Sequence, residues 1–217
     1  MDKKVAIFWD WNGTVVDDAF IFVKIMNFFL EERGLKNISI DDYKKKFEFP
    51  VKKYYLNLGF DFKEESFSSL GRRFIDKYTK YQFDGSLFPG IKDLLFDLKN
   101  RGFCQFVVSA QENGLLVSSV RHYGLDGCFN RFVGVSNFFA KGKVELAKNL
   151  YNNFLSKKYK VFLVGDTLYD IKVAASINAT PVLVSFGHND KKRLLRSGAL
   201  VIDSVEELSS FLINPCC

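Results

Sequence analysis

The sequence is poor in the features that mark secreted and membrane proteins. Four cysteines occur in 217 residues, and they show neither metal-ligand spacing nor a disulfide framework: Cys104, Cys128, Cys216 and Cys217. The longest apolar run, 20–30, is interrupted by Lys24 and Asn27 and is too short to span a bilayer. The first residues lead directly into a predicted strand, so we expect no signal peptide. We therefore expect a cytoplasmic protein with reduced thiols and no membrane contact.

The terminal pair Cys216 and Cys217 has two interpretations, a lipidation site or a frayed end of the chain. No polybasic run precedes the pair. A single lipid anchor binds membranes weakly without such a second signal, so we favour the frayed end.

The charge balance is mildly basic. Lys and Arg number 31 against 25 Asp and Glu, which gives a net charge of +6. No arginine-rich stripe or base-stacking motif accompanies the excess, which argues against a nucleic-acid partner. The charge suits a small anionic substrate instead. Hydrophobic residues make up 47% of the chain, enough for a large core and a smaller inserted domain.

Short apolar runs alternate with amphipathic stretches along most of the chain. The runs predict strands at 4–9, 104–109, 131–135, 160–164, 181–184 and 200–202. The stretches between and after them predict helices at 91–101, 113–123, 142–155, 168–177, 190–196 and 205–212. Strands that alternate with helices predict an α/β fold with a doubly wound parallel sheet.

A lysine-rich region separates the first predicted strand from the second. A helix is predicted at 19–33, and the lysine-rich region that follows, at about 35–84, holds predicted helices at 43–47, 51–58 and 67–81 and no strand. A turn at 87–90, which contains Pro89 and Gly90, returns the chain to the alternating pattern. We therefore predict an α/β core domain at 1–16 and 85–217 and an inserted, all-helical cap domain at 17–84.

Polar residues stand where several predicted strands end. The first strand ends at Asp10, the second at Ser109, and the fourth is followed by Asp166 and Asp170. Each of them alone is explained as well by helix capping. Carboxyl ends of parallel strands form one edge, however, and three nearby carboxylates repel one another unless a cation joins them. An oxygen-rich site of this kind suits Mg²⁺.

Together these residues resemble the motifs of the haloacid dehalogenase (HAD) superfamily of phosphohydrolases, in particular its phosphoglycolate-phosphatase-like branch. The stretch Asp10–Thr14 resembles the first motif, Asp-x-Asp-Gly-Thr, and Val107–Ser109 resembles the second. Lys143 is our choice for the motif lysine, with Lys141 as the alternative. The stretch Val164–Asp170 is similar to the fourth motif. The resemblance covers the whole chain and implies a Rossmann-like core with a helical cap inserted after the first motif.

The resemblance implies a nucleophile and a metal site. Asp10 would attack phosphorus to form an aspartyl-phosphate. Mg²⁺ would be held by Asp10, Asp166 and the main-chain carbonyl of Asn12. Asp170 would be a further ligand of the ion, or a hydrogen-bond acceptor that orients the ligands without touching the ion.

The same resemblance implies a binding site for the phosphate group. Its expected members are the Ser109 hydroxyl, the backbone N–H of Ala110 at a helix start, and Thr14. Lys143 would neutralise the charge that builds on the phosphate and Asp10. The implied activity is that of a Mg²⁺-dependent phosphohydrolase with a small phosphorylated metabolite as its substrate.

One position departs from the family pattern. The second Asp of the first motif is the family's general acid and base, and Asn12 stands there. An amide cannot supply this proton transfer, which is typically worth about 10²–10⁴-fold. Either another group, such as water, a cap residue or Asp17, donates the proton, or the substrate has a good leaving group. The alternative is a catalytically weakened relative that binds phosphate-bearing ligands, and we favour the active enzyme.

A receiver-type signalling domain is the rival interpretation. It combines a doubly wound sheet with an acidic Mg²⁺ site and a phosphorylated aspartate. That aspartate lies on a later strand than the acidic pair, and no cap is inserted. Here the motif aspartate ends the first predicted strand and a helical region follows at once, which favours the phosphohydrolase.

Three further features have open interpretations. Aromatic residues beside lysines at 47–55 can line a substrate pocket or belong to a solvated helix. Gln111 and Glu112 follow the second strand and can face the substrate or start the next helix. His188 lies in a loop near the predicted crevice, where capping by Asn189 or Asp190 explains the stretch equally well.

Overall fold

The computed structural model describes residues 4–136, 142–155 and 159–214. Lys141, the alternative motif lysine, and the terminal pair Cys216 and Cys217 lie outside these described residues. No helix in these ranges is long and apolar enough to cross a membrane.

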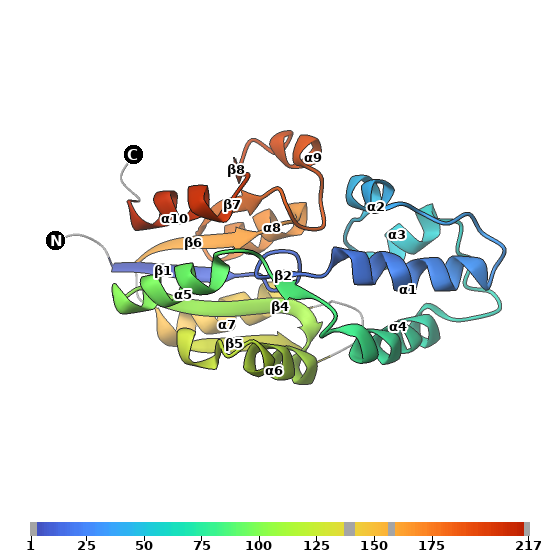
Figure 1. Cartoon of the computed structure of the whole chain (residues 1–217), viewed down its shortest axis with the longest axis horizontal. Coiled ribbons are helices and arrows are strands. Elements are labelled where there is room, and N and C mark those ends of the chain that lie inside the picture. The colour runs from blue at the N-terminus through green and yellow to red at the C-terminus, as the bar shows by residue number, and fades with distance from the viewer. Residues whose placement is uncertain (1–3, 137–141, 156–158, 215–217) are drawn as a thin grey trace.

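Six parallel strands form the main sheet, in the order β5-β4-β1-β6-β7-β8 (Figure 1). They are β1 (Lys4–Trp9), β4 (Cys104–Glu112), β5 (Arg131–Val135), β6 (Tyr159–Gly165), β7 (Thr180–Val184) and β8 (Leu200–Ile202). The predicted doubly wound α/β fold is confirmed. Strand β4 runs three residues past its predicted end, because the chain pairs again with β5 at Glu112 after an irregularity beyond Val108.

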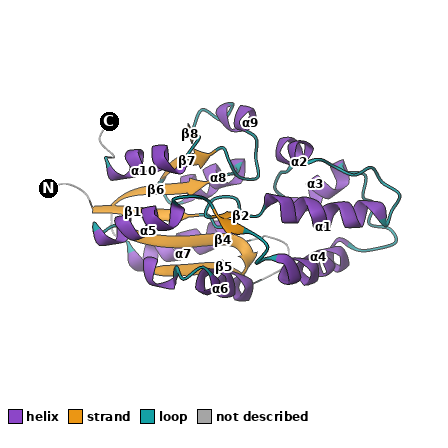
Figure 2. Ribbon diagram, in the orientation of Figure 1, coloured by secondary structure: helices purple, strands orange, loops and turns teal. Residues whose placement is uncertain are grey.

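Helices cover both faces of this sheet (Figure 2). They are α5 (Ile91–Asn100), α6 (Asn113–His122), α7 (Lys143–Phe154), α8 (Leu168–Ser176), α9 (Lys191–Leu195) and α10 (Val205–Ile213), with a 3₁₀ turn, η1, at Asp126–Cys128. One apolar layer packs α5, α6 and α10 on one face, and a second packs α7 and α8 on the other. Because both faces are covered, the central strands are apolar on both sides rather than alternating.

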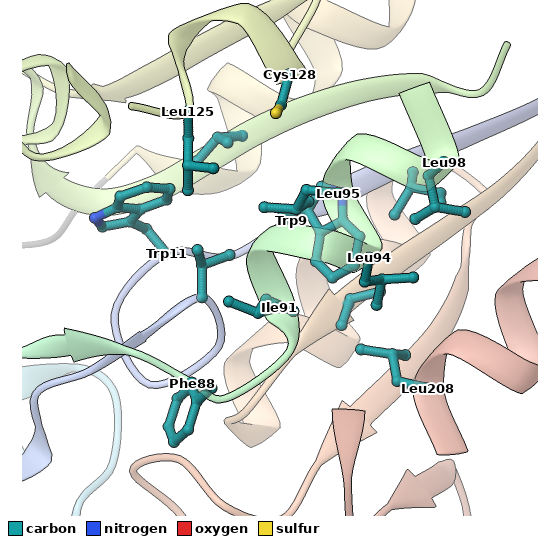
Figure 3. Packing of buried hydrophobic residues seen from close by; sticks show 14 of the residues in the cluster. Trp9, Trp11, Phe88, Ile91, Leu94, Leu95, Leu98, Leu125, Cys128 and Leu208 are labelled. Carbon is teal, nitrogen blue, oxygen red and sulfur yellow. The ribbon is translucent and has the colours of Figure 1, made fainter. Parts of the chain in front are cut away.

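Strand β1 shows how the two layers are divided. Ile7 and Trp9 point into the layer of α5 and α10, where Trp9 lies close to Leu94, Leu95 and Leu98 (Figure 3). The intervening residues Ala6 and Phe8 belong to the opposite layer. Side chains of a strand alternate between faces, so Asp10 is directed toward the α7 face.

Four further helices lie together beyond the carboxyl end of the sheet (Figure 1). They are α1 (Ala19–Glu31), α2 (Ile40–Lys46), α3 (Val51–Asn57) and α4 (Phe67–Tyr81), and they share an apolar cluster of their own. Two short antiparallel strands, β2 (Val16–Asp17) and β3 (Ser86–Leu87), pair where the chain leaves and re-enters the core. Strands of two residues are too short to show the alternation of apolar and polar residues, so the sequence analysis did not predict them. The division into a core at 1–16 and 85–217 and a cap at 17–84 stays a prediction.

Candidate active site

Two tryptophans hold the segment that carries Asp10. Trp9 and Trp11 are both fully buried in the same apolar layer. The Trp9 indole donates to Gln105 Oε1 at 3.1 Å, and the Trp11 indole donates to Ser119 Oγ at 3.0 Å. With its neighbours anchored on one face, the Asp10 carboxylate is fixed on the other, at the carboxyl edge of the sheet.

Lys143 binds Asp10 from the start of α7. Its Nζ lies 2.7 Å from Asp10 Oδ2 and 2.6 Å from Asp170 Oδ1. The lysine side chain is only 2% exposed. A buried ammonium is strongly disfavoured unless carboxylates neutralise it, and these two do so. The choice of Lys143 as the lysine beside Asp10 therefore has direct geometric support.

Asp166 and Asp170 stand beside Asp10: Asp166 directly follows the adjacent strand β6, and Asp170 lies in the first turn of α8. Asp166 accepts from the Thr14 hydroxyl at 3.2 Å and from the His188 backbone N–H at 2.5 Å. Asp170 accepts from the backbone N–H and hydroxyl of Thr167, at 3.0 and 2.8 Å. One carboxylate oxygen from each of Asp10, Asp166 and Asp170 lies within 4.8 Å of the others, a spacing that a single cation can bridge.

Burial and mutual repulsion perturb these carboxyls. Burial, reinforced by Asp170 and Asp166 and opposed by Lys143, raises the pKa of Asp10 to about 7. Burial also raises the pKa of Asp166 to about 6, although the nearby His188 works against it. Burial alone would lower the pKa of Lys143, but Asp10 and Asp170 outweigh it and the pKa is raised. The carboxyl cluster thus has more negative charge than Lys143 alone neutralises.

Two glycines let the backbone close around Asp166. A Cβ on Gly13 would lie 2.2 Å from Asp166 Oδ2, and Gly13 has φ +72. A Cβ on Gly187 would lie 2.4 Å from the same oxygen. Only glycine fits at either position without displacing the carboxylate. This explains the glycine of the first motif in terms of packing.

The predicted phosphate-binding residues divide into two groups. Ser109 and Ala110 line a cavity beside Asp10, and the Ser109 hydroxyl accepts from the Gln111 backbone N–H at 3.0 Å. They lie within β4, so the expected helix start at Ala110 is wrong: α6 begins only at Asn113. Thr14 is fully buried and is not among the cavity residues, because its hydroxyl is directed at Asp166. Its geometry suits positioning of that carboxylate better than binding phosphate.

The Asn12 side chain is held by two cap-side residues that the sequence analysis missed. Its Nδ2 donates to Asp18 Oδ2 at 2.5 Å and to the Tyr78 hydroxyl at 2.7 Å. Tyr78 donates in turn to Asp18 Oδ2 at 2.8 Å. Asp17, suggested as a replacement proton donor, is exposed in β2 and is absent from the cavity lining. The adjacent Asp18 is the one that points inward, and no sequence pattern distinguishes the two.

His188 completes this network. Its Nε2 lies 3.1 Å from Asp18 Oδ1, and its Nδ1 lies 2.6 Å from the Tyr43 hydroxyl on α2. Burial alone would lower the pKa of His188, but Asp18 and Asp166 outweigh it and raise the pKa. Asp190 also caps the next helix, α9, as the alternative explanation expected of Asn189 or Asp190: it accepts from Arg193 N at 2.8 Å. In this loop His188 therefore faces the predicted crevice, while Asp190 caps the next helix.

A cavity of about 140 Å³ opens between the acidic cluster and the helices α1 to α4. Its sheet-side lining includes Asp10, Asn12, Ser109, Ala110, Asp166 and His188. Its helix-side lining is mostly aromatic and includes residues of the 47–55 stretch, where the lysines themselves are absent from the lining. Both Gln111 and Glu112 also line it, while Glu112 caps α6 by accepting from Leu115 N at 3.0 Å.

Comparison with known proteins identifies the family. Residues 7–184 match the haloacid dehalogenase-like hydrolases, and this range holds every motif residue described above. The chain belongs to the haloacid dehalogenase-like hydrolases. The resemblance inferred from the motifs is confirmed, as is the expectation of an enzyme.

Three proteins illustrate the relationship of this haloacid dehalogenase-like hydrolase to others. The phosphoglycolate phosphatase of Caulobacter vibrioides is 27% identical over 92% of this chain and 86% of its own length. That of Synechococcus elongatus is 24% identical over 88% of each chain. The crystal structure of a predicted phosphatase from Clostridium acetobutylicum has a TM-score of 0.83 and 22% identity, and covers 99% of this chain and 100% of its own. At that identity the structural match supports the fold.

Proposed function

We propose that this haloacid dehalogenase-like hydrolase is a Mg²⁺-dependent phosphatase that acts on a small phosphorylated metabolite. The observation that carries the proposal is the paired contact of buried Lys143 with Asp10 and Asp170, next to the cavity that Asp10 lines. A nucleophilic carboxylate needs a neighbouring cation to approach a phosphate anion. The two relatives named as phosphoglycolate phosphatases support the same reaction class.

The donor set of the acidic cluster suits Mg²⁺. The carboxylates of Asp10 and Asp166 and the main-chain carbonyl of Asn12 would hold the ion. Both oxygens of Asp170 already accept hydrogen bonds from Lys143 and Thr167, so we propose that Asp170 orients the site from behind. When bound, the ion neutralises phosphoryl oxygens as they meet the carboxylate.

In the proposed reaction Asp10 attacks phosphorus. A bond forms between a carboxylate oxygen and phosphorus as the bond to the leaving oxygen breaks, and the leaving alkoxide takes a proton. Water then attacks the aspartyl-phosphate, which releases phosphate and regenerates Asp10. Lys143 stabilises the charge that develops, and the Ser109 hydroxyl and Ala110 N–H would hold phosphoryl oxygens.

The proton required by the leaving group has no donor at Asn12. Its amide is already committed to Asp18 and Tyr78, and an amide does not transfer protons. The alternative function is therefore a weakened relative that binds phosphate-bearing ligands, or one that hydrolyses only esters with good leaving groups. A substrate whose oxygen leaves easily keeps the phosphatase proposal intact.

The test is a panel of phosphate monoesters assayed with Mg²⁺ and with a chelator. We expect turnover that is lost in chelator and lost in Asp10→Asn, and a phosphoryl group on the Asp10 peptide after acid quenching. Activity that persists unchanged in chelator contradicts the Mg²⁺-dependent mechanism. Turnover without a phosphorylated Asp10 peptide, with Asp10→Asn still active, contradicts the covalent one.

We also propose a cytoplasmic location. The described cysteines, Cys104 and Cys128, are free thiols, as a reducing compartment requires. Cell fractionation tests this: recovery of the protein with membranes or secreted material contradicts it.

A further inference from the structure

The cavity beside Asp10 has an aromatic and apolar character. Nine aromatic residues line it, and examples from four different segments are Phe22, Phe49, Tyr54 and Phe74. Three of its lining residues, Asp10, Glu112 and Asp166, are acidic, and no Lys or Arg is among the described residues that line it. A carboxylated leaving group would face ring edges and carboxylates there, and the lining histidine, His188, already pairs with Asp18.

The size of the cavity limits what it can hold. Its volume of about 140 Å³ is close to the roughly 150 Å³ of an apolar protein cavity that accommodates one benzene ring. Aromatic walls favour an aromatic guest, through stacked and edge-on contacts at ring separations of about 4.5–7 Å. A single ring therefore fits the space and the lining.

Two polar side chains in the lining have no hydrogen-bond partner among the described residues. The Tyr54 hydroxyl and both amide atoms of Gln111 are buried and make no hydrogen bond within the part of the chain that the structure describes. Tyr54 is 1% exposed and Gln111 is 9% exposed. Buried polar groups are nearly always paired, so a neutral donor or acceptor on a bound molecule would complete the hydrogen bonding of these atoms.

The identity of residue 12 places a separate demand on the substrate. Because Asn12 cannot protonate the leaving oxygen, an oxygen that leaves as a stable anion is favoured. A phenol has a pKa of about 10, well below the value of about 15.7 for water. A phenolate thus departs without the general acid that an alkoxide needs.

We propose that the substrate is an aryl phosphate, the phosphate monoester of a single-ring phenol that carries an uncharged polar substituent. This rests on the proposed phosphatase function and names its substrate class. Asp10 bonds to phosphorus, the aryl oxygen leaves with the electron pair of the broken P–O bond, and the phenolate takes a proton from water. The neutral ring occupies the aromatic cavity, and its substituent pairs with Tyr54 or Gln111. Esters with a carboxylated leaving group, such as phosphoglycolate, are poor ligands.

Binding measurements test the cavity without relying on turnover. Phenylphosphonate and phosphonoacetate share a phosphonate and differ in the group that would enter the cavity, a neutral ring or a carboxylate. With Mg²⁺ present, we expect phenylphosphonate to bind at least tenfold more tightly by calorimetry. Equal affinity, or tighter binding of phosphonoacetate, overturns the proposal even if the protein is a competent phosphatase.

Kinetics of matched esters extend the test. We expect kcat/KM for phenyl phosphate to exceed that for phosphoglycolate by at least tenfold. A preference for phosphoglycolate overturns the aryl proposal and leaves the phosphatase function standing. Absence of turnover for every ester contradicts the proposed function, whereas the phosphonate preference still decides the substrate class of the site.

A partly exposed lining residue offers a position where substitution should reverse the preference for a neutral ligand over a carboxylated one. Ile75 on α4 lines the cavity at its half-buried edge, so a polar side chain is tolerated there. Ile75→Arg introduces the missing cation, and we expect it to shift the ratio of phosphonoacetate to phenylphosphonate affinity by at least tenfold. Ile75→Gln is the matched neutral control and should leave the ratio within twofold. If Ile75→Arg leaves this affinity ratio unchanged, the proposal that the leaving group enters the aromatic cavity is wrong.

The substituent is tested at Tyr54. Tyr54→Phe keeps the ring and removes only the unpartnered hydroxyl. We expect it to reduce the preference for 4-hydroxyphenyl phosphate over phenyl phosphate by at least threefold, or Gln111→Leu to do so if the amide is the partner. If neither variant alters that preference, the proposed polar substituent is wrong.

Discussion

The side-chain amide of Asn12 donates to Asp18 Oδ2 at 2.5 Å, and Asp18 lies on the cap side of the junction that β2 and β3 form. Asp18 also accepts from the Gly13 backbone N–H at 3.2 Å and from Tyr78 at 2.8 Å. A carboxylate at position 12 would place two negative charges at hydrogen-bond distance. Asn12, the residue that departs from the family motif, is therefore a hydrogen-bond donor to Asp18, six positions later, which an aspartate would repel.

The first prediction concerns this pair. In Asn12→Asp, repulsion from Asp18 raises the pKa of one carboxyl, so the folded state keeps a proton that the unfolded state loses. A raised folded-state pKa contributes stability at low pH that is lost as pH rises, and we expect a loss of about 3 kcal/mol at pH 8 and little at pH 4. The double variant Asn12→Asp/Asp18→Asn restores the donor–acceptor pair.

Urea unfolding at the two pH values measures this effect, and Asp18→Asn alone is the control. We expect the double variant to recover most of the stability and, because it regains an acid at position 12, to hydrolyse alkyl phosphates at least tenfold faster than the natural chain. Equal stability of single and double variants at pH 8 would show that Asp18 does not repel the new carboxylate.

The second prediction concerns the ammonium between two carboxylates. Lys143→Met leaves Asp10 and Asp170 buried without their cation, which should cost about 3 kcal/mol at pH 8 and less at pH 5, where the carboxyls can protonate. Turnover should fall by about 10²–10³-fold. Lys148→Met lies on the same helix at an exposed contact with Glu145 and should change stability by less than about 0.5 kcal/mol. Similar losses in both variants would refute a special role for Lys143.

The third prediction concerns pH and metal. The pKa values of about 7 for Asp10 and about 6 for Asp166 exceed the usual value of 3.8, so both carboxyls retain protons on folding. Metal-free protein should therefore lose stability as pH rises from about 4 to about 7, by up to about 4 kcal/mol for Asp10. Mg²⁺ favours the ionised carboxylates, so its stabilisation should grow over the same range and release protons.

Melting temperatures with and without Mg²⁺ at pH 5 and pH 8 measure this coupling, and calorimetry in two buffers counts the protons. Asp166→Asn is the control and should remove most of the Mg²⁺-dependent increase in Tm. A Mg²⁺ effect that is larger at pH 5 than at pH 8 would contradict carboxylates as the binding groups.

The fourth prediction separates backbone strain from crowding. Gly13→Ala places a Cβ 2.2 Å from Asp166 Oδ2 in a backbone with φ +72, whereas Gly102 has φ +81 with nothing within 4 Å of its Cβ position. Gly102→Ala should cost about 1–2 kcal/mol, the penalty of the left-handed conformation alone. Gly13→Ala should cost about 2 kcal/mol more and weaken Mg²⁺ binding. Indistinguishable unfolding midpoints for the two variants would contradict the crowding around Asp166.

Much of the fold follows from local patterns in the sequence. The predicted bounds of α4 (67–81), β5 (131–135) and β8 (200–202) agree with the structure, because amphipathic and apolar periodicity ends at clear boundaries there. The pair β2 and β3 was missed because two residues carry no period. The end of β4 was placed too early, since an irregular strand that pairs again at Glu112 cannot be recognised without its partner.

The sequence by itself indicated the fold class, the family and the central residues of the candidate site. Asp10, Asp166 and Asp170 were proposed because each follows a strand or starts a helix within a recognisable motif, and Lys143 was proposed with Lys141 as the alternative. The tertiary structure decided what surrounds them. Asp18, Tyr78, Tyr43 and His188 meet only because the helices α1 to α4 lie beyond the carboxyl edge of the sheet, and their contacts join residues 60 to 170 positions apart. The aromatic cavity is likewise a product of packing, since its lining comes from segments whose local patterns give no sign of sharing one space.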